Sequence, residues 1–231
     1  MTSAAGSWFR EDVRRLVLIL VRHGQSEANA AGVLLGRTDS ELTDLGRLQA
    51  SRIGHALARS VRHVSGGGDD GPGVRVPIRI LTSPLVRARL TAKIISEVLG
   101  PGVPQPEVEE RLIELDYGEL DGKRPADLAP GVWSGWRSDP TWRPSGGESF
   151  VDLHARVDPL WASLAEEAAA GDVIAVSHVS PIKAAVAWTL GAGPELAWKL
   201  SLGVAAITRI SFGGRAPALV SFGETDHLSG I

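Results

Sequence analysis

The sequence predicts an α/β fold, a three-layer sandwich in which helices cover both faces of a mostly parallel sheet. Short runs rich in Leu, Ile and Val alternate with longer segments of helical periodicity. The clearest apolar runs are residues 16–21, 78–81 and 172–177, and two later runs at 206–212 and 218–222 complete the sheet. Runs with no polar side are typical of strands buried on both faces, as in parallel sheets. Their alternation with helical segments indicates helical crossovers between parallel strands.

Three segments carry the signature of a helix start. Thr43 is suited to the N-cap of a helix from residue 44 to about 61. Pro84 is suited to the first turn of a second helix, and Glu148 or Ser149 begins a third. The first helix should bury one apolar face, which consists of Leu45, Leu48, Ile53, Ala56 and Leu57.

The 231 residues are enough for one domain with a sizeable core, which we expect to span residues 1–231. Residues 1–15 are polar and charged and are predicted to be an N-terminal extension. Residues 65–77 are predicted to be an insertion loop, because their Gly- and Asp-rich start buries too little apolar surface to order itself. The α/β pattern resumes directly afterwards, so no domain boundary is expected there.

Charge and composition exclude several classes of partner and site. The net charge of -3 provides no global attraction to nucleic acid or to an anionic membrane, so we expect neither as a partner. The absence of cysteine excludes disulfides and thiolate metal sites, and it fits a cytoplasmic protein. The apolar run at 16–21 is far shorter than a membrane span.

Charged and polar residues gather after the predicted strands. Arg22 and His23 follow the first strand, Arg87 lies in the first turn of the helix after the second, and His178 ends the third apolar run. Ligands of open α/β sheets bind beyond the carboxyl ends of the strands, so these side chains are expected to share one site. A fourth segment, rich in acidic residues, supplies Glu114.

Ordered motifs in these segments resemble those of the histidine phosphatase superfamily, which includes phosphoglycerate mutases and small phosphomonoesterases. The motifs are Arg-His-Gly at 22–24, Thr-Ser-x-Leu-x-Arg-Ala-x-x-Thr-Ala at 82–92, Leu-x-Glu at 112–114, Gly-Glu-Ser at 147–149 and Val-Ser-His at 176–178. Two positions depart from the family pattern, since Asp121 replaces a glutamate and Val179 replaces a glycine. The resemblance implies that Arg87 is a phosphate ligand and that Glu114 occupies the acid position.

The residue types at these positions fit the same chemistry. Two arginines suit a multidentate grip on a tetrahedral oxyanion. Their like charge disfavours the protonated form of His23, which leaves a lone pair that can attack phosphorus. Protonated Glu114 would give its proton to the leaving oxygen and, as a carboxylate, would then activate water.

The predicted function is hydrolysis of a small-molecule phosphomonoester through a phosphohistidine intermediate. The predicted catalytic residues are His23, Glu114, His178, Arg22 and Arg87. Neither a metal nor another cofactor is expected, because two arginines in the site would repel a divalent cation. Further predicted contacts with the phosphate or the substrate are Gln25, Ser26, Asn29, Gly36 and the Val179 amide.

Two alternative functions stay open. One is a phosphoglycerate-type mutase, which would need a second cationic cluster to hold a bisphosphorylated intermediate. The other is a catalytically silent phosphate-binding module. The oligomeric state is also open, with a homodimer among the options. Trp133, Trp136 and Trp142 are expected either to stack on a substrate or to anchor a loop rich in Pro and Gly.

Overall fold

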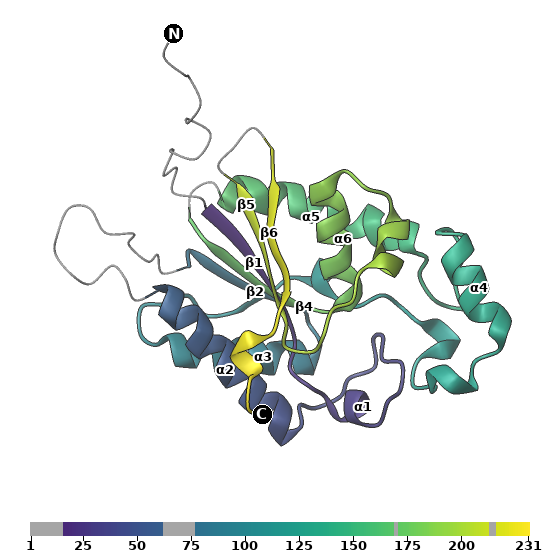
Figure 1. Cartoon of the computed structure of the whole chain (residues 1–231), viewed down its shortest axis with the longest axis horizontal. Coiled ribbons are helices and arrows are strands. Elements are labelled where there is room, and N and C mark those ends of the chain that lie inside the picture. The colour runs from purple at the N-terminus through teal and green to yellow at the C-terminus, as the bar shows by residue number, and fades with distance from the viewer. Residues whose placement is uncertain (1–15, 62–76, 169–170, 213–215) are drawn as a thin grey trace, which may run out of the picture.

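The computed structural model describes residues 16–61, 77–168, 171–212 and 216–231. The predicted extension at 1–15 and residues 65–76 of the predicted insertion lie outside this part of the chain. The described residues are built on one six-stranded sheet with helices on both of its faces (Figure 1). The prediction of an α/β sandwich is therefore confirmed.

The strands follow the order β3-β2-β4-β1-β5-β6 across the sheet. β3, β2, β4 and β1 are parallel neighbours, whereas β5 pairs antiparallel with β1, and β6 pairs antiparallel with β5. The carboxyl ends of β1, β2 and β4 consequently lie at the same edge of the sheet. The strand bounds are β1 Leu16–Arg22, β2 Arg79–Thr82, β3 Glu107–Val108, β4 Val173–Ser177, β5 Ile207–Phe212 and β6 Ala218–Glu224.

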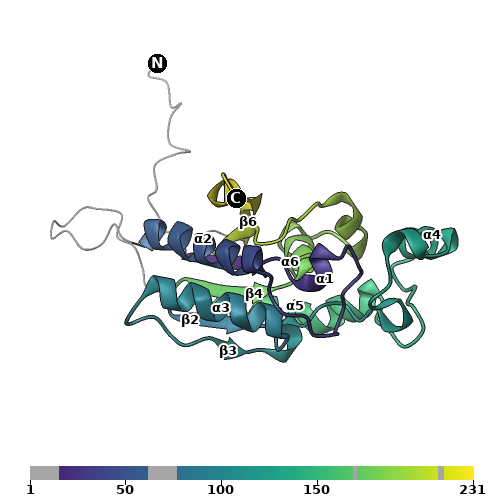
Figure 2. The ribbon, with the colours of Figure 1, turned by 90° about the horizontal axis from the view of Figure 1, so that it is seen from below.

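Side chains of the central strand β1 alternate between two hydrophobic cores. Ile19 and Val21 belong to the core shared with α2 (Asp44–Val61) and α3 (Val86–Leu99). Leu18 and Leu20 belong to the core shared with α5 (Phe150–Ala168) and α6 (Val179–Leu190). Figures 1 and 2 show the α2–α3 pair and the α5–α6 pair on opposite faces of the sheet. Burial of both faces explains the uninterrupted apolar sequence of β1.

α2 begins where the sequence predicts, but its buried face is narrower. Thr43 caps the helix, because its Oγ1 accepts a hydrogen bond from Gly46 N at 3.0 Å. Leu45 and Leu48 are 37% and 44% exposed, although both were expected in the apolar face. The helix therefore packs on the sheet mainly through its later turns.

Two further elements do not follow from the sequence pattern. β3 consists of two exposed residues, so it has no apolar run that would predict it. α4 (Pro130–Ser138) lies in the segment expected to be a loop, and Figure 1 places it at the periphery, away from the sheet. Ile78, predicted as a strand residue, precedes β2 and is 47% exposed.

The remaining helices are short. They are the α-helical turn α1 (Glu27–Ala30) and the 3-10 helices η2 (Glu110–Leu112), η3 (Gly118–Leu120), η4 (Pro125–Asp127), η5 (Pro194–Lys199) and η6 (Asp226–Leu228). In the part of the chain that the structure describes, no helix is both long and apolar enough to cross a lipid bilayer.

Candidate active site

The ends of neighbouring parallel strands bring the two predicted catalytic histidines together. Arg22, the last residue of β1, is the register partner of Ser177, the last residue of β4. His23 N donates to Ser177 O at 3.1 Å, and His178 follows Ser177 directly. The ring centroids of His23 and His178 are 4.9 Å apart. Two residues far apart in the chain thus share one site because their strands are neighbours.

The tautomer of His23 follows from its hydrogen bond. Nδ1 lies 2.7 Å from Gly24 O. Because a carbonyl oxygen can only accept, Nδ1 carries the ring proton and Nε2 carries the lone pair. Burial, together with the positive charges of Arg87 and Arg22, holds the pKa of His23 well below its usual 6.5. His23 is therefore neutral near pH 7, with a nucleophilic lone pair on Nε2.

Arg22 and Arg87 keep positive charge and unused donors inside the site. Arg22 donates to Leu202 O at 2.6 Å, and Arg87 donates to Gly36 O at 2.7 Å and to Thr38 O at 3.0 Å. These partners are neutral carbonyl oxygens, so they do not neutralise the guanidinium charges. Both Nε atoms are buried and have no hydrogen-bond partner among the described residues. The pair is suited to bind the oxygens of an anion.

Glu114 is fixed at the start of α6 and is 4% exposed. Its Oε1 accepts from Leu115 N at 2.8 Å and from Ser180 N at 3.1 Å, and its Oε2 accepts from Val179 N at 3.1 Å. These contacts leave one lone pair of Oε2 unused, at which a proton can be gained or lost. The carboxyl group thus has a fixed orientation and an atom available for proton transfer.

The backbone accommodates a valine at position 179, where the family pattern has a glycine. Ala205 is the one non-glycine residue of the described chain with a positive φ, so Val179 lies in ordinary helical backbone and its side chain causes no strain there. Its amide, which the sequence analysis assigned to the substrate, donates to Glu114 instead. Val179 therefore positions the acid.

His178 is fully buried and is oriented by a residue that the sequence analysis gave no role. Its Nε2 lies 2.7 Å from the hydroxyl of Ser83, in the loop after β2. Burial is the main cause that holds the pKa of His178 well below 6.5, and the neighbouring His23 and Arg87 lower it further. When Ser83 donates its hydroxyl proton to Nε2, the ring proton is on Nδ1. Nδ1 has no partner among the described residues and can donate to a phosphoryl oxygen.

The polar residues after β1 bond to one another and to α2. Ser26 and Asn29 form a capping box around α1, with Asn29 N to Ser26 Oγ at 3.3 Å and Ser26 N to Asn29 Oδ1 at 3.1 Å. Gln25 Oε1 accepts from Thr43 Oγ1 at 2.9 Å. These contacts shape the loop, and direct contacts of the three side chains with a substrate stay predictions.

Gly36 and Asp121 shape the loop that holds Arg87. A Cβ atom on Gly36 would lie 2.9 Å from Leu115 O, so a larger residue would not fit where Gly36 O meets Arg87. Asp121 accepts hydrogen bonds from Gly36 N, Arg37 N and Thr38 N at 2.9, 3.1 and 3.0 Å. Asp121, which replaces the family glutamate, therefore acts indirectly, through the carbonyl groups that bind Arg87.

A second supporting network holds the backbone before Glu114. Arg156, on α5, donates to Arg111 O at 2.6 Å and to Ile113 O at 3.0 Å. It also forms an ion pair with Glu148 at 2.9 Å. No sequence pattern predicts this role of Arg156, and the Gly-Glu-Ser motif that contains Glu148 is the one signal near it.

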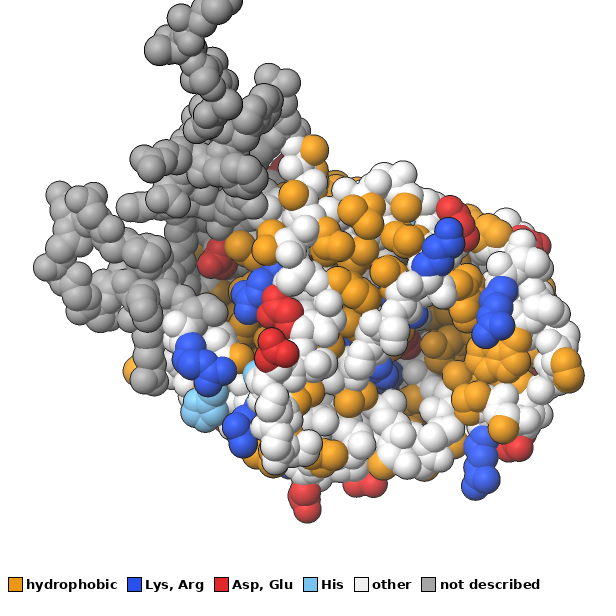
Figure 3. Space-filling model, viewed as in Figure 1, with side chains coloured by type: hydrophobic (Ala, Val, Ile, Leu, Met, Phe, Trp, Pro, Cys, Tyr) orange, Lys and Arg blue, Asp and Glu red, His pale blue; other side chains and the backbone are white. Residues whose placement is uncertain are grey.

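A tryptophan cluster, formed by Trp133, Trp136, Trp142 and Trp198, lies beside the catalytic residues. Trp136 is 2% exposed, and its ring centroid is 5.4 to 6.2 Å from those of the other three. Tyr117 joins the cluster to the site, because its ring packs edge-on to Trp136 and its hydroxyl is bonded to Ser180. Figure 3 shows a hollow between α6 and α4, where basic side chains lie next to a hydrophobic patch.

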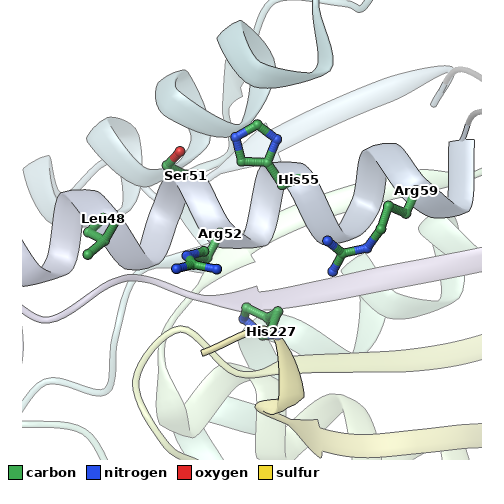
Figure 4. Close-up of a pocket in the computed structure, with 6 residues that line it drawn as sticks. All are labelled: Leu48, Ser51, Arg52, His55, Arg59 and His227. Carbon is green, nitrogen blue, oxygen red and sulfur yellow. The ribbon is translucent and has the colours of Figure 1, made fainter. Parts of the chain in front are cut away.

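A groove lies outside this site, and the described residues offer no cluster of metal ligands. The described residues contain no group of three or more side chains that could hold a metal ion. A groove of about 460 Å³ lies between α2 and η6 and contains none of the predicted catalytic residues (Figure 4). It is lined by Leu48, Ser51, Arg52, His55, Arg59 and His227.

The arrangement of two arginines, two histidines and a glutamate at one sheet edge agrees with a known family. The sequence profile of the histidine phosphatase superfamily (branch 1) matches residues 18–225. The chain belongs to this superfamily. The resemblance of the motifs is thus confirmed over nearly the whole described structure.

Members of the superfamily with different activities are similar to this chain. The glucosyl-3-phosphoglycerate phosphatase of Mycobacterium tuberculosis is 38% identical over 150 residues, which are 64% of this chain and 59% of that relative. The chain thus spans less than two thirds of that phosphatase. The 2,3-bisphosphoglycerate-dependent phosphoglycerate mutase of Methylobacterium radiotolerans is 35% identical over 177 residues, which are 74% of this chain and 77% of the mutase.

A solved structure shares the whole architecture. A mycobacterial glucosyl-3-phosphoglycerate phosphatase in complex with VO3 superposes with a TM-score of 0.74 at 32% identity. The superposition covers 90% of this chain and 99% of the other. The similarity therefore extends over both helical layers as well as the site motifs.

Proposed function

We propose that this protein hydrolyses a small-molecule phosphate ester through a phosphohistidine intermediate, with no metal and no other cofactor. The observation that carries the proposal is the neutral, buried His23, whose Nε2 lone pair lies beside the half-buried Arg22 and the buried Arg87. A neutral imidazole can attack phosphorus, and the arginines can bind the phosphoryl oxygens. Phosphatases among the relatives support this choice.

In the first step, the Nε2 lone pair of His23 forms a bond to phosphorus while the ester P–O bond breaks. Protonated Glu114 gives its proton to the leaving oxygen, which departs as an alcohol. The imidazole ring is then cationic, and its Nδ1–H still donates to Gly24 O. In the second step, Glu114 takes a proton from water as the water oxygen attacks phosphorus. The N–P bond breaks, which releases phosphate and restores neutral His23.

The magnitudes indicate where most of the catalysis lies. Hydrolysis of a phosphate monoester requires acceleration of up to ~10²¹-fold. A general acid contributes only about 10²- to 10⁴-fold. The larger part must come from in-line positioning and from the positive charges of Arg22 and Arg87, together with the Nδ1–H donor of His178, which stabilise the charge of the transition state.

Replacement of His23 tests the proposal. His23→Ala should abolish hydrolysis of p-nitrophenyl phosphate, because no other residue in the site has the same lone pair. It should also abolish acid-labile labelling of the protein by a phosphorylated substrate. The matched control is His55→Ala, an exposed histidine on α2, which should retain both activities. If His23→Ala keeps a tenth or more of the activity, His23 is not the nucleophile.

Because one relative is a phosphoglycerate mutase, mutase activity is the second candidate function. A mutase must hold a doubly phosphorylated intermediate, which requires a second cluster of free cations. In the segment after Glu114, Arg143 forms an ion pair with Asp152, and the guanidinium group of Arg137 lies 5.6 Å from the Trp198 ring centroid. These basic side chains are spread along an exposed helix and loop, which favours a phosphatase.

The products formed from 3-phosphoglycerate distinguish the two activities. The protein is incubated with 3-phosphoglycerate and catalytic 2,3-bisphosphoglycerate, and the products are separated. A phosphatase releases inorganic phosphate, whereas fast interconversion of 2- and 3-phosphoglycerate with little free phosphate would establish a mutase. Binding of phosphate without turnover of any ester would identify a silent binding module.

The composition supports a proposal about the location of the protein and its binding partners. We place the protein in the cytoplasm because it has no cysteine, and we expect no nucleic acid or membrane partner because its net charge is -3. The oligomeric state, a homodimer included, is measured by sedimentation velocity. Salt-dependent retention on DNA or on anionic vesicles would contradict the assignment of partners.

A further inference from the structure

The groove between α2 and η6 is a cavity that the proposed chemistry does not use. Its volume of about 460 Å³ lies within the range of pockets that bind small molecules. Two guanidinium groups and two imidazole rings are among the side chains that line it, and none of its lining residues in the described chain is acidic. The groove therefore presents positive charge without a counter-ion of its own, which suits an anionic ligand.

The two arginines of the groove, Arg52 and Arg59, face the same space. Figure 4 shows both side chains pointing from α2 toward η6, with His227 opposite them, and Arg59 leans back along the helix toward Arg52. Neither arginine forms an ion pair within the described residues, whereas Arg47, on the same helix, is paired with Glu41 at 3.5 Å. Like charges that share one space repel each other, and an anion between them removes this repulsion.

His227 provides a fixed polar group on the facing wall. Its Nε2 lies 3.0 Å from Ala205 O, so Nε2 carries the ring proton and the ring is held in place before any ligand binds. Burial is the main cause that lowers the pKa of His227, and the charge of Arg59 lowers it further. An anion beside the ring would favour its protonated form, in which Nδ1–H is an additional donor to the ligand.

The spacing of the two arginines indicates the size of the anion. Residues 52 and 59 are seven apart, close to two helical turns, so they share a face of α2 and their Cα atoms are about 10 Å apart along the axis. A single phosphate could bond fully to both guanidinium groups only if the two like charges came together. A chain of two or three phosphoryl groups presents oxygens along its length, so it can bind both arginines while they stay apart.

We propose that the groove between α2 and η6 is a second anion site, separate from the catalytic one, and that it binds a small oligophosphate. Arg52 and Arg59 bind phosphoryl groups at the two ends of the chain, and His227 donates to an oxygen between them. The site goes beyond the proposed function, because none of the predicted catalytic residues lines it. The ligand class comprises inorganic oligophosphates and the phosphate chains of nucleotides, which present the same oxygens.

Calorimetric titration with inorganic tripolyphosphate tests the site. Arg52→Gln and Arg59→Gln should each raise the Kd by about 10- to 100-fold, because a charge-assisted contact is lost. Both residues are exposed, and glutamine is a good helix former, so α2 should stay folded in either variant. The part of orthophosphate binding that depends on these arginines should be about tenfold weaker or more, since one phosphate contacts one arginine at a time.

A matched control separates the groove from overall charge. Arg47→Gln removes one exposed arginine from the same helix, outside the groove, and should leave the Kd for tripolyphosphate unchanged. The inference is wrong if Arg47→Gln weakens binding as much as Arg52→Gln, or if neither groove variant weakens it. Orthophosphate that binds the groove as tightly as tripolyphosphate would overturn the assignment of an oligophosphate.

Inhibition of hydrolysis reports on the catalytic end separately, since anions can also bind at Arg22 and Arg87. Competitive inhibition of p-nitrophenyl phosphate hydrolysis by tripolyphosphate and by orthophosphate should be the same in the wild-type protein and in both groove variants. If the protein hydrolyses no ester but the calorimetric Kd depends on Arg52 and Arg59, the groove site stands and the phosphatase assignment fails. A nucleoside triphosphate and tripolyphosphate are then compared, and equal dependence on the two arginines assigns recognition to the phosphate chain. Binding of the nucleotide alone would contradict the proposal.

Discussion

The catalytic end of the sheet and the tryptophan cluster beside it are built in different ways. At the catalytic end, Arg22, His23 and His178 come directly from strand ends, so the register of β1 and β4 determines where they lie. The tryptophan cluster comes from α4, η5 and irregular segments, and contacts between aromatic rings centred on Trp136 hold it together. Backbone pairing therefore positions the predicted catalytic residues, and side-chain packing positions the aromatic surface beside them.

The two regions also differ in their energetics. The catalytic end buries polar and charged groups, since His23, His178, Arg87 and Glu114 are each at most 4% exposed. Burial of such groups opposes folding unless every donor and acceptor is bonded, and several of these donors are not. The tryptophan cluster buries apolar aromatic surface, which stabilises the fold. Substitutions in the first region should therefore reduce activity, and those in the second should reduce stability.

The largest expected effect is a loss of activity caused by a substitution at the catalytic end. Glu114→Gln should slow hydrolysis of alkyl phosphates by about 10²- to 10⁴-fold, because their leaving oxygen needs a proton. The loss on p-nitrophenyl phosphate should be much smaller, because its anion leaves without protonation. The protein should remain folded, since the glutamine oxygen still accepts from Leu115 N and Ser180 N and only Val179 N loses its acceptor. Equal losses on both substrates would show that another residue, with Asp116 as the next candidate, is the acid.

The next largest effect is expected in the tryptophan cluster, where a substitution should reduce stability more than activity. Trp136→Ala should lower the free energy of unfolding by about 3–5 kcal/mol, because it removes a buried ring at the centre of the cluster. Denaturant titration measures this loss. The matched variant Trp133→Ala, at a half-buried position, should cost less stability. If Trp136→Ala unfolds at the wild-type denaturant concentration, aromatic packing does not hold this region together.

The smallest expected effect is on the pH dependence of stability, which arises from the two buried histidines at the catalytic end. His23 and His178 have pKa values held well below 6.5 in the folded protein, so below pH 6.5 the unfolded chain binds more protons than the folded one. The stability that each neutral ring provides is present above pH 6.5 and is lost as the pH falls. The loss is about 1.4 kcal/mol per pH unit for each histidine.

A single substitution checks this pH dependence. His178→Gln should reduce the slope of unfolding free energy against pH between pH 6.5 and 5, because one proton-binding difference is removed. The exposed His55 provides the control, since His55→Gln should leave the slope unchanged. A wild-type slope in His178→Gln would contradict the neutral state of the buried ring.

The sequence alone was sufficient for most of the central sheet and for placing several polar residues together at its edge. The apolar runs that became β1, β2 and β4 are buried on both faces, so their composition carries a strong signal of their structure. Because parallel strands end at the same edge, the strand positions alone place Arg22, His23 and His178 together. The remaining two, Arg87 and Glu114, came from motif positions. Their assignment as the catalytic set stays a prediction.

The tertiary structure decided the features that depend on partners distant in the chain. β3 has no apolar run of its own and exists because β2 offers it hydrogen bonds. Ser83, Asp121 and Arg156 are ordinary polar residues in the sequence, and their roles arise from partners 42 to 95 residues away. Local patterns report which face of an element is apolar, whereas polar contacts between distant segments depend on how the whole chain packs.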